Sequence, residues 1–116
     1  MKILYVEDSP DQVANLERIA HHLGHELVVA TTGEQGYSLV QEQPDLVLLD
    51  INLPDTNGLD LARRLRAEHQ IMPIVAITAD VYLYDEAQAL QAGCTAFVSK
   101  PYSVETIKEL FTRFSQ

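Results

Sequence analysis

Short apolar runs alternate along this chain with segments in which apolar residues recur every three or four positions. Unbroken apolar runs are typical of strands covered on both faces of a parallel sheet, whereas the longer spacing is typical of helices with one buried face. The pattern predicts strands at residues 2–6, 27–30, 46–49, 74–77 and 96–98. It predicts helices at residues 9–23, 32–40, 59–66, 85–92 and 103–114.

Polar residues of suitable type stand at the predicted helix ends. Ser9 is a good N-cap and Gln12 completes a Ser-x-x-Gln capping box, while Thr32 and Gln35 offer a second box. Gly24 follows the first helix as a stop signal, because glycine tolerates the left-handed conformation common at helix C-termini. These signals support the helix boundaries that the apolar spacing predicts.

Five strand–helix units in strict alternation predict an α/β fold. Such units form a five-stranded parallel sheet with right-handed crossovers, doubly wound so that helices cover both faces. Neither an internal repeat nor a linker-like stretch interrupts the pattern, so we expect residues 1–116 to form a single domain. In sheets of this class, ligands bind beyond the carboxyl ends of the strands.

Composition and charge narrow the range of partners. The 116 residues are 47% hydrophobic, which is enough for a sizeable core, and the formal net charge is −9. This acidity argues against direct binding to nucleic acid or to an anionic membrane surface. The one cysteine, Cys94, cannot form an internal disulfide, and no apolar stretch is long enough to span a membrane. We therefore expect a cytoplasmic protein.

Polar residues stand at the carboxyl ends of four predicted strands, and all of them should share one edge of the sheet. They are Glu7, Asp8, Asp50, Thr78 and Lys100. Crowded carboxylates repel one another, so we expect at least one raised pKa and a need for a cation. An all-oxygen ligand set suits Mg²⁺. The lysine, the hydroxyl and a carboxylate nucleophile then suggest aspartyl phosphorylation.

Together these residues resemble the motifs of the receiver domains of two-component response regulators. The motifs that carry the resemblance are Glu7-Asp8, Asp50, Thr78-Ala79 and Lys100-Pro101, with Pro54 and Gly58 in the loop after the third strand. The resemblance covers essentially the whole chain. It implies a flavodoxin-like sheet with strand order 2-1-3-4-5.

The resemblance also implies the chemistry of the site. Asp50 would accept a phosphoryl group from a histidine kinase or a histidine phosphotransfer protein, and the domain would then change its binding to a downstream protein target. Mg²⁺ would be held by Glu7, Asp8, Asp50 and the backbone carbonyl of Asn52.

The same resemblance assigns the remaining roles. Thr78, Lys100 and the backbone amide of Ala79 would contact the phosphoryl oxygens. Phe97 matches the aromatic switch position of the family, and the Lys100–Pro101 peptide is expected to be cis.

Asn52 and Asp80 stand two residues beyond the acceptor and the threonine. Their side chains would flank the path of an attacking water and so tune the lifetime of the phosphoryl group.

Two alternative functions remain open. A scaffold that works without phosphorylation would be expected to lack the metal acids or the lysine. A Mg²⁺-dependent phosphatase of the haloacid dehalogenase type would carry an Asp-x-Asp motif, whereas Asp50-Ile51-Asn52 lacks the second acid. We therefore expect no turnover of external substrates. No acidic pair precedes Phe97, so we expect a monomer rather than the dimer that some receivers form.

Overall fold

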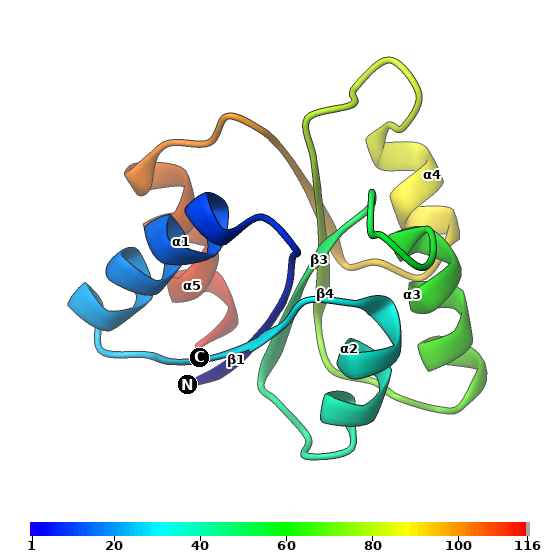
Figure 1. Cartoon of the computed structure of the whole chain (residues 1–116), viewed down its shortest axis with the longest axis horizontal. Helices are drawn as coiled ribbons and strands as arrows, with labels where there is room; N and C mark the ends of the chain where they lie inside the picture. The colour runs from blue at the N-terminus through cyan, green and yellow to red at the C-terminus, as the bar shows by residue number, and fades with distance from the viewer. Residues whose placement is uncertain (116) are drawn as a thin grey trace.

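The computed structural model describes residues 1–115, in which five strands and five helices alternate (Figure 1). The strands are β1 (Lys2–Val6), β2 (Glu26–Ala30), β3 (Leu46–Asp50), β4 (Ile74–Thr78) and β5 (Ala96–Ser99). The helices are α1 (Pro10–His22), α2 (Gly33–Val40), α3 (Gly58–Ala67), α4 (Glu86–Gln91) and α5 (Val104–Phe114). Every predicted element is present.

The five strands form one parallel sheet in the order β2-β1-β3-β4-β5. This confirms both the fold class and the expected strand order. The central strand β3 is buried along its whole length, which accounts for its unbroken apolar run, since both of its faces are covered by helices. It carries Asp50 from the interior of the protein to the carboxyl edge of the sheet.

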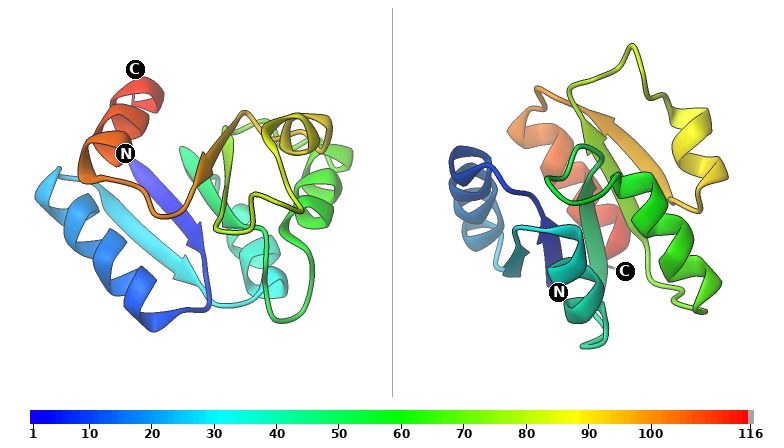
Figure 2. Two further views of the ribbon diagram at one scale, coloured as in Figure 1. Left: turned by 90° about the horizontal axis from the view of Figure 1, so that it is seen from above. Right: turned by 45° about the vertical axis from the view of Figure 1, so that its right-hand side comes forward.

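Helices cover both faces of the sheet. Figure 1 shows α1 and α5 on one side and α2, α3 and α4 on the other, and Figure 2 shows the same three layers in two further views. Neighbouring residues of β1 divide between the two cores: Ile3 and Tyr5 pack on the α1/α5 side, Leu4 and Val6 on the opposite side. Within residues 1–115, no helix has the length and hydropathy needed to cross a membrane.

The helix caps confirm the predicted starts and correct one detail. Ser9 and Thr32 accept hydrogen bonds from backbone amides in the first turns of α1 and α2. Within residues 1–115 neither predicted box is complete. The first has only the bond from the Gln12 amide to Ser9, and in the second Gln35 Oε1 accepts from the amide and hydroxyl of Thr31 instead of from Thr32. A complete capping box is found at α4, whose N-cap is Asp85.

Element ends differ slightly from the predicted ones. Asp50 and Thr78 are the last residues of β3 and β4, so both strands are one residue longer than predicted. Helix α4 is shorter at both ends than the predicted residues 85–92. Val104, the first residue of α5, is exposed, whereas Ile107 one turn later is buried.

Gly58 allows the loop after β3 to turn back close to Asp50. A Cβ atom at this position would lie 2.3 Å from the Asp50 carbonyl oxygen and 2.8 Å from the Cα of Ile51, so only glycine fits. The Gly58 amide donates to the Ile51 carbonyl at 2.7 Å. Residues 52–57 are therefore held beside the carboxyl edge of the sheet.

Candidate functional site

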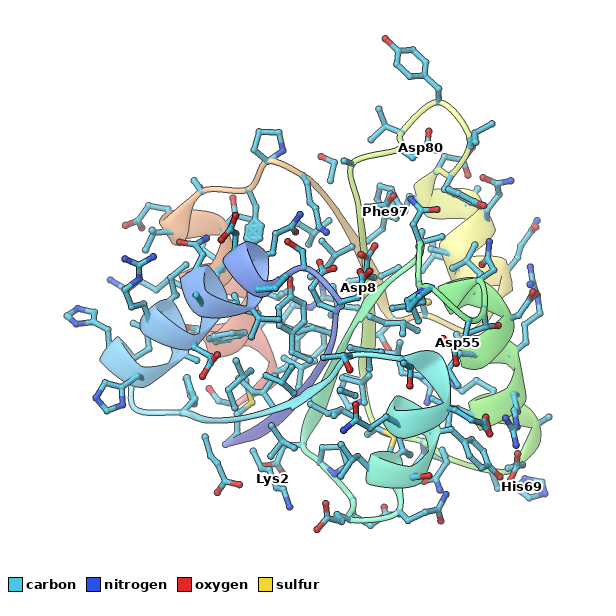
Figure 3. The ribbon with its side chains drawn as sticks, viewed as in Figure 1. Lys2, Asp8, Asp55, His69, Asp80 and Phe97 are labelled. Carbon is cyan, nitrogen blue, oxygen red and sulfur yellow. The ribbon has the colours of Figure 1, made fainter. Side chains whose placement is uncertain are left out.

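Three carboxylates meet at the carboxyl edge of the sheet. Glu7 and Asp8 follow β1, and Asp50 ends the neighbouring strand β3. One carboxylate oxygen from each residue lies within 4.8 Å of the other two. Glu7 and Asp50 are buried and Asp8 is exposed, and Figure 3 shows Asp8 at the end of the sheet opposite Lys2. The predicted cluster therefore exists, with one carboxylate facing solvent.

Glu7 has a hydrogen-bond donor on each of its acceptor positions. Lys100 Nζ and the Tyr5 hydroxyl both donate to Oε1, at 2.7 and 3.2 Å. The backbone amides of Asp8 and Ser9 donate to Oε2, at 3.1 and 3.3 Å. A carboxylate has about four acceptor sites, and here all are used. Binding a metal directly would require Glu7 to exchange one of these donors.

Lys100 lies between two of the carboxylates and is closer to one of them. Its Nζ is 2.7 Å from Glu7 Oε1 and 3.5 Å from Asp50 Oδ2. The backbone amide of Lys100 donates to the Thr78 carbonyl at 2.8 Å, which fixes the loop after β5 against β4. The Lys100–Pro101 peptide is cis, as the resemblance implied.

The Asp50 carboxyl is the member of the cluster whose ionisation is most strongly opposed by its surroundings. Burial and the neighbouring Glu7 carboxylate raise the pKa of Asp50 to about 7, against the influence of Lys100 and of the Asn52 amide, which donates to Oδ1 at 3.1 Å. Burial also opposes ionisation of Glu7, but the neighbouring Asp50 and Lys100 side chains lower its pKa. The expected raised pKa is thus found on Asp50. A cation at this site would allow both carboxyls to ionise, so the residues fit a metal.

Thr78 and Ala79 border the cluster from β4. Thr78 is fully buried, and its Oγ1 accepts a hydrogen bond from the Asp80 amide at 3.0 Å, so its hydroxyl proton can be donated to a ligand. Ala79 is exposed and lines a depression of about 270 Å³ together with Lys100. Figure 3 shows Asp80 on the loop that follows β4.

The loop after β3 forms the opposite wall of the site. Asp8 and Asn52 line a depression of about 420 Å³ beside this loop. Asn52 and Asn57 form an isolated antiparallel bridge, and the Asn57 side chain donates to the Tyr84 hydroxyl at 2.9 Å. The backbone of Asn52 is therefore held in place by contacts within the loop and with the segment that precedes α4.

Asp55 ties the same loop to helix α2. Its carboxylate accepts hydrogen bonds from the backbone amides of Gly33, at 2.8 Å, and Glu34, at 3.1 Å. These two amides lie in the first turn of α2, where helix amides have no partner within the helix. The amide of Gly33, followed by that of Glu34, lowers the pKa of Asp55. The loop and α2 are thereby joined through an ionised carboxylate.

Phe97 lies on β5, the strand next to the one that carries Thr78. It is half-buried and packs against the core on the side of α2, α3 and α4. In the β4–β5 register it stands opposite Ala76, two residues before Thr78. Side chains two residues apart in a strand point to the same face. Thr78 and Phe97 therefore share one face of the sheet on neighbouring strands.

A family model for the response regulator receiver domain matches residues 3–112. The chain belongs to this family. Among curated relatives, the polar-differentiation response regulator DivK of Brucella ovis is 34% identical over 113 residues, which cover 91% of this chain and 92% of DivK. DivK of Brucella suis matches to the same extent.

Solved receiver domains have the same fold as this receiver domain. The BeF3-activated N-terminal receiver domain of Klebsiella pneumoniae RstA superposes with a TM-score of 0.88 at 28% identity and covers 98% of this chain and 97% of its own. The receiver domain of a sensor histidine kinase from Pseudomonas aeruginosa has a TM-score of 0.87 at 29% identity, with 97% and 95% coverage. The latter structure contains a magnesium ion coordinated in its active site cleft.

Sequence reasoning missed two contacts that shape the site of this receiver domain. The apolar pattern places Tyr5 only within the first strand. A buried tyrosine hydroxyl usually needs a partner, however, and here it donates to Glu7. Burial, with Tyr102 and Glu7 nearby, raises the pKa of Tyr5, so its hydroxyl stays a proton donor. The bond from Asn57 to Tyr84 had no signal in the local sequence, because it joins two different loops.

Proposed function

We propose that this receiver domain accepts a phosphoryl group on Asp50 from a phosphohistidine of a histidine kinase or a histidine phosphotransfer protein. The observation that carries the proposal is the place of Asp50, buried at the end of the central strand among Glu7, Asp8 and Lys100. An Asp50 oxygen would form a bond to phosphorus while the bond from phosphorus to the histidine nitrogen breaks. The product would be an aspartyl phosphate.

Mg²⁺ is the cation that we propose for the site. Asp8, Asp50 and the Asn52 carbonyl would hold it as oxygen donors, and Glu7 would ligate it only by exchanging one of its present donors. When bound, the ion would neutralise charge on the transferring phosphoryl group. The raised pKa of Asp50 supports this assignment, because a nearby cation favours the ionised carboxylate that must act as nucleophile.

Residues opposite the acids would bind the phosphoryl oxygens. Lys100 supplies a positive charge 3.5 Å from Asp50 Oδ2, and Thr78 supplies a hydroxyl donor at the end of the next strand. The backbone amide of Ala79 lies directly beyond Thr78 and would add a third donor. Such donors would stabilise the charge that develops on the phosphoryl oxygens.

Modification of the wild-type protein by a small phosphodonor tests this function. With phosphoramidate and Mg²⁺, mass spectrometry should find one phosphoryl group per chain, on Asp50 alone. Modification should disappear with a chelator or in the Asp50→Asn variant, and the control Asp60→Asn, at an exposed position on α3, should behave like wild type. A phosphoryl group on another residue would contradict the assignment.

The same incubation separates the competing functions. A phosphorylation-independent scaffold would show no modification, and a phosphatase would consume many equivalents of donor without accumulating a phosphorylated form. We propose that the domain catalyses only its own phosphorylation and dephosphorylation. The presence of the acids and of Lys100 in one cluster favours this over the scaffold.

We further propose that output to a downstream protein passes from Thr78 to Phe97. If Thr78 moves to donate to a phosphoryl oxygen, it leaves space on the face of the sheet that it shares with Phe97. Phosphorylation would then bias the packing of Phe97 and change the surface near α4. Amide chemical shifts should change around Phe97 on addition of beryllofluoride and Mg²⁺. Changes confined to the neighbours of Asp50 would refute this route.

The lifetime of the aspartyl phosphate should depend on Asn52 and Asp80. Asn52 is exposed and Asp80 is half-buried, so both can contact water at the mouth of the site. Their short polar side chains would orient an attacking water. Replacing Asn52 with methionine and Asp80 with lysine should lengthen the lifetime several-fold, measured as decay of the phosphorylated form after the donor is removed. An unchanged decay rate would show that these residues do not control hydrolysis.

A further inference from the structure

Tyr5 places a hydroxyl group in the core directly behind the cluster of acids. The residue is fully buried on β1, on the side of the sheet covered by α1 and α5. Its hydroxyl donates to Glu7 Oε1 at 3.2 Å. A hydroxyl left without a partner in the core would be costly, so this bond fixes the phenol and the carboxylate relative to each other.

Tyr5 and Lys100 donate to the same oxygen of Glu7. Lys100 Nζ lies 2.7 Å from Oε1 and 3.5 Å from Asp50 Oδ2, so the lysine is bound more closely to Glu7 than to the acceptor. We expect Lys100 to move from Glu7 toward a phosphoryl group on Asp50, because its present distance to Asp50 Oδ2 is the longer of the two. This movement would leave a carboxylate that is 1% exposed without its cation.

The other oxygen of Glu7 cannot compensate for the loss of Lys100. Oε2 already accepts from the backbone amides of Asp8 and Ser9. Both amides belong to the turn between β1 and α1, so they hold the plane of the carboxylate and keep Oε1 directed at Lys100 and Tyr5. The Tyr5 hydroxyl is thus the side-chain donor, within residues 1–115, that stays on Oε1 when Lys100 leaves.

We propose that Tyr5 is a positioning residue for phosphoryl transfer: it holds the Glu7 carboxylate in its orientation while Lys100 moves from Glu7 to the phosphoryl group on Asp50. The inference rests on the proposed function. In the described part of the chain Tyr5 has no hydrogen bond to Asp50, so it would act through Glu7 and Lys100. A hydrogen bond to a charged group is stronger than one between neutral groups, which gives this single hydroxyl a measurable effect.

The variant Tyr5→Phe removes the hydroxyl and keeps the ring that packs in the core. With phosphoramidate and saturating Mg²⁺, its maximal phosphorylation rate should fall about tenfold, with an unchanged half-saturation concentration for the donor; tenfold corresponds to about 1.4 kcal/mol in the barrier. The matched control is Tyr37→Phe, which also removes a hydroxyl that donates to a glutamate, Glu68, on the exposed surface. Its rate should equal that of wild type.

A double-mutant cycle separates positioning through Lys100 from a general loss of structure. In a Lys100→Gln background, Tyr5→Phe should cause no further decrease in rate, because there is no lysine left to release. An equal further decrease in that background would overturn the proposal. The cycle isolates the interaction between the two residues from their separate effects.

A measurement on the wild-type protein keeps the inference falsifiable if a variant folds poorly. In a crystal structure with beryllofluoride and Mg²⁺, the Tyr5 hydroxyl should remain bonded to Glu7 while Lys100 Nζ has left it. Lys100 still on Glu7, or Tyr5 turned away from it, overturns the proposal. Absence of any phosphorylation of wild type would overturn the proposed function and this inference together. A modified wild type with an equally fast Tyr5→Phe variant overturns the inference alone.

Discussion

Replacing Lys100 with alanine is expected to lower the free energy of unfolding by about 3 kcal/mol at neutral pH, because it leaves the Glu7 carboxylate buried without a cation. The Lys100 side chain is 11% exposed and that of Glu7 is 1% exposed, and their charged atoms are 2.7 Å apart. Little water therefore reaches the charged atoms of this pair in the wild-type protein. Urea denaturation of the variant and the wild type at pH 7.5, with a chelator present, measures the difference.

The control for this variant is a salt bridge of the same length on the surface. Arg63 and Asp60 are also 2.7 Å apart, but their side chains are 55% and 66% exposed, so Arg63→Ala should cost at most about 1 kcal/mol. Adding Glu7→Gln to Lys100→Ala should restore most of the lost stability, because it removes the buried charge. The deficit should also shrink as the pH falls and Glu7 takes up a proton. A loss no larger than that of Arg63→Ala would mean that Glu7 is not held as a buried ion.

The fold follows from the sequence because its signals are local. Each strand of the sheet is an apolar run that is too short for a helix, and Ser9 and Thr32 mark helix starts by hydrogen bonds to amides within the next turn. The order of the strands then follows from the family resemblance, and strand ends bring Asp50 and Thr78 to one edge. The apolar runs and the helix caps can each be recognised from a few neighbouring residues.

The details of the site could not be predicted because they depend on pairs that are distant in the sequence. Asp55 bonds to α2 amides more than 20 residues away, and nothing near Asp55 indicates that partner. The choice of Lys100 for Glu7 over Asp50 depends on a difference between 2.7 and 3.5 Å. The sequence pattern also gives no difference in burial between Glu7, Asp8 and Asp50. In the structure Glu7 and Asp50 are buried and Asp8 is exposed.

This unequal burial predicts that Asp50→Asn raises the stability of the metal-free protein. In the unfolded chain the Asp50 carboxyl titrates near its ordinary pKa of 3.8, while in the folded protein burial and the Glu7 carboxylate raise its pKa to about 7. Between these values the folded state binds more protons than the unfolded state. The stability of wild type therefore falls as the pH rises from about 4 to 7, and it levels off above that range.

The stability gained by Asp50→Asn depends on the pKa shift of Asp50 and on the interactions of Asp50 with Glu7 that the substitution removes. Each pKa unit is worth about 1.4 kcal/mol. Burial opposes ionisation of Glu7, and the neighbouring Asp50 helps to lower the pKa of Glu7, so replacing Asp50 also removes some stabilisation of the Glu7 carboxylate. We expect a net gain of about 2–3 kcal/mol at pH 8 and almost none at pH 4. Urea denaturation at the two pH values, in the presence of a chelator, measures both numbers.

The matched control for this prediction is Asp8→Asn, which removes one negative charge from the same cluster at its exposed position. Its stability should differ from that of wild type by less than about 0.5 kcal/mol, as is usual for surface substitutions. Mg²⁺ should reverse the order, because a ligand that binds only the folded state stabilises wild type and does much less for Asp50→Asn. If Asp50→Asn is no more stable than wild type at pH 8 without metal, then Asp50 is not strained by Glu7. That result would mean that Lys100 neutralises both carboxylates, so that the ionised Asp50 does not destabilise the metal-free protein.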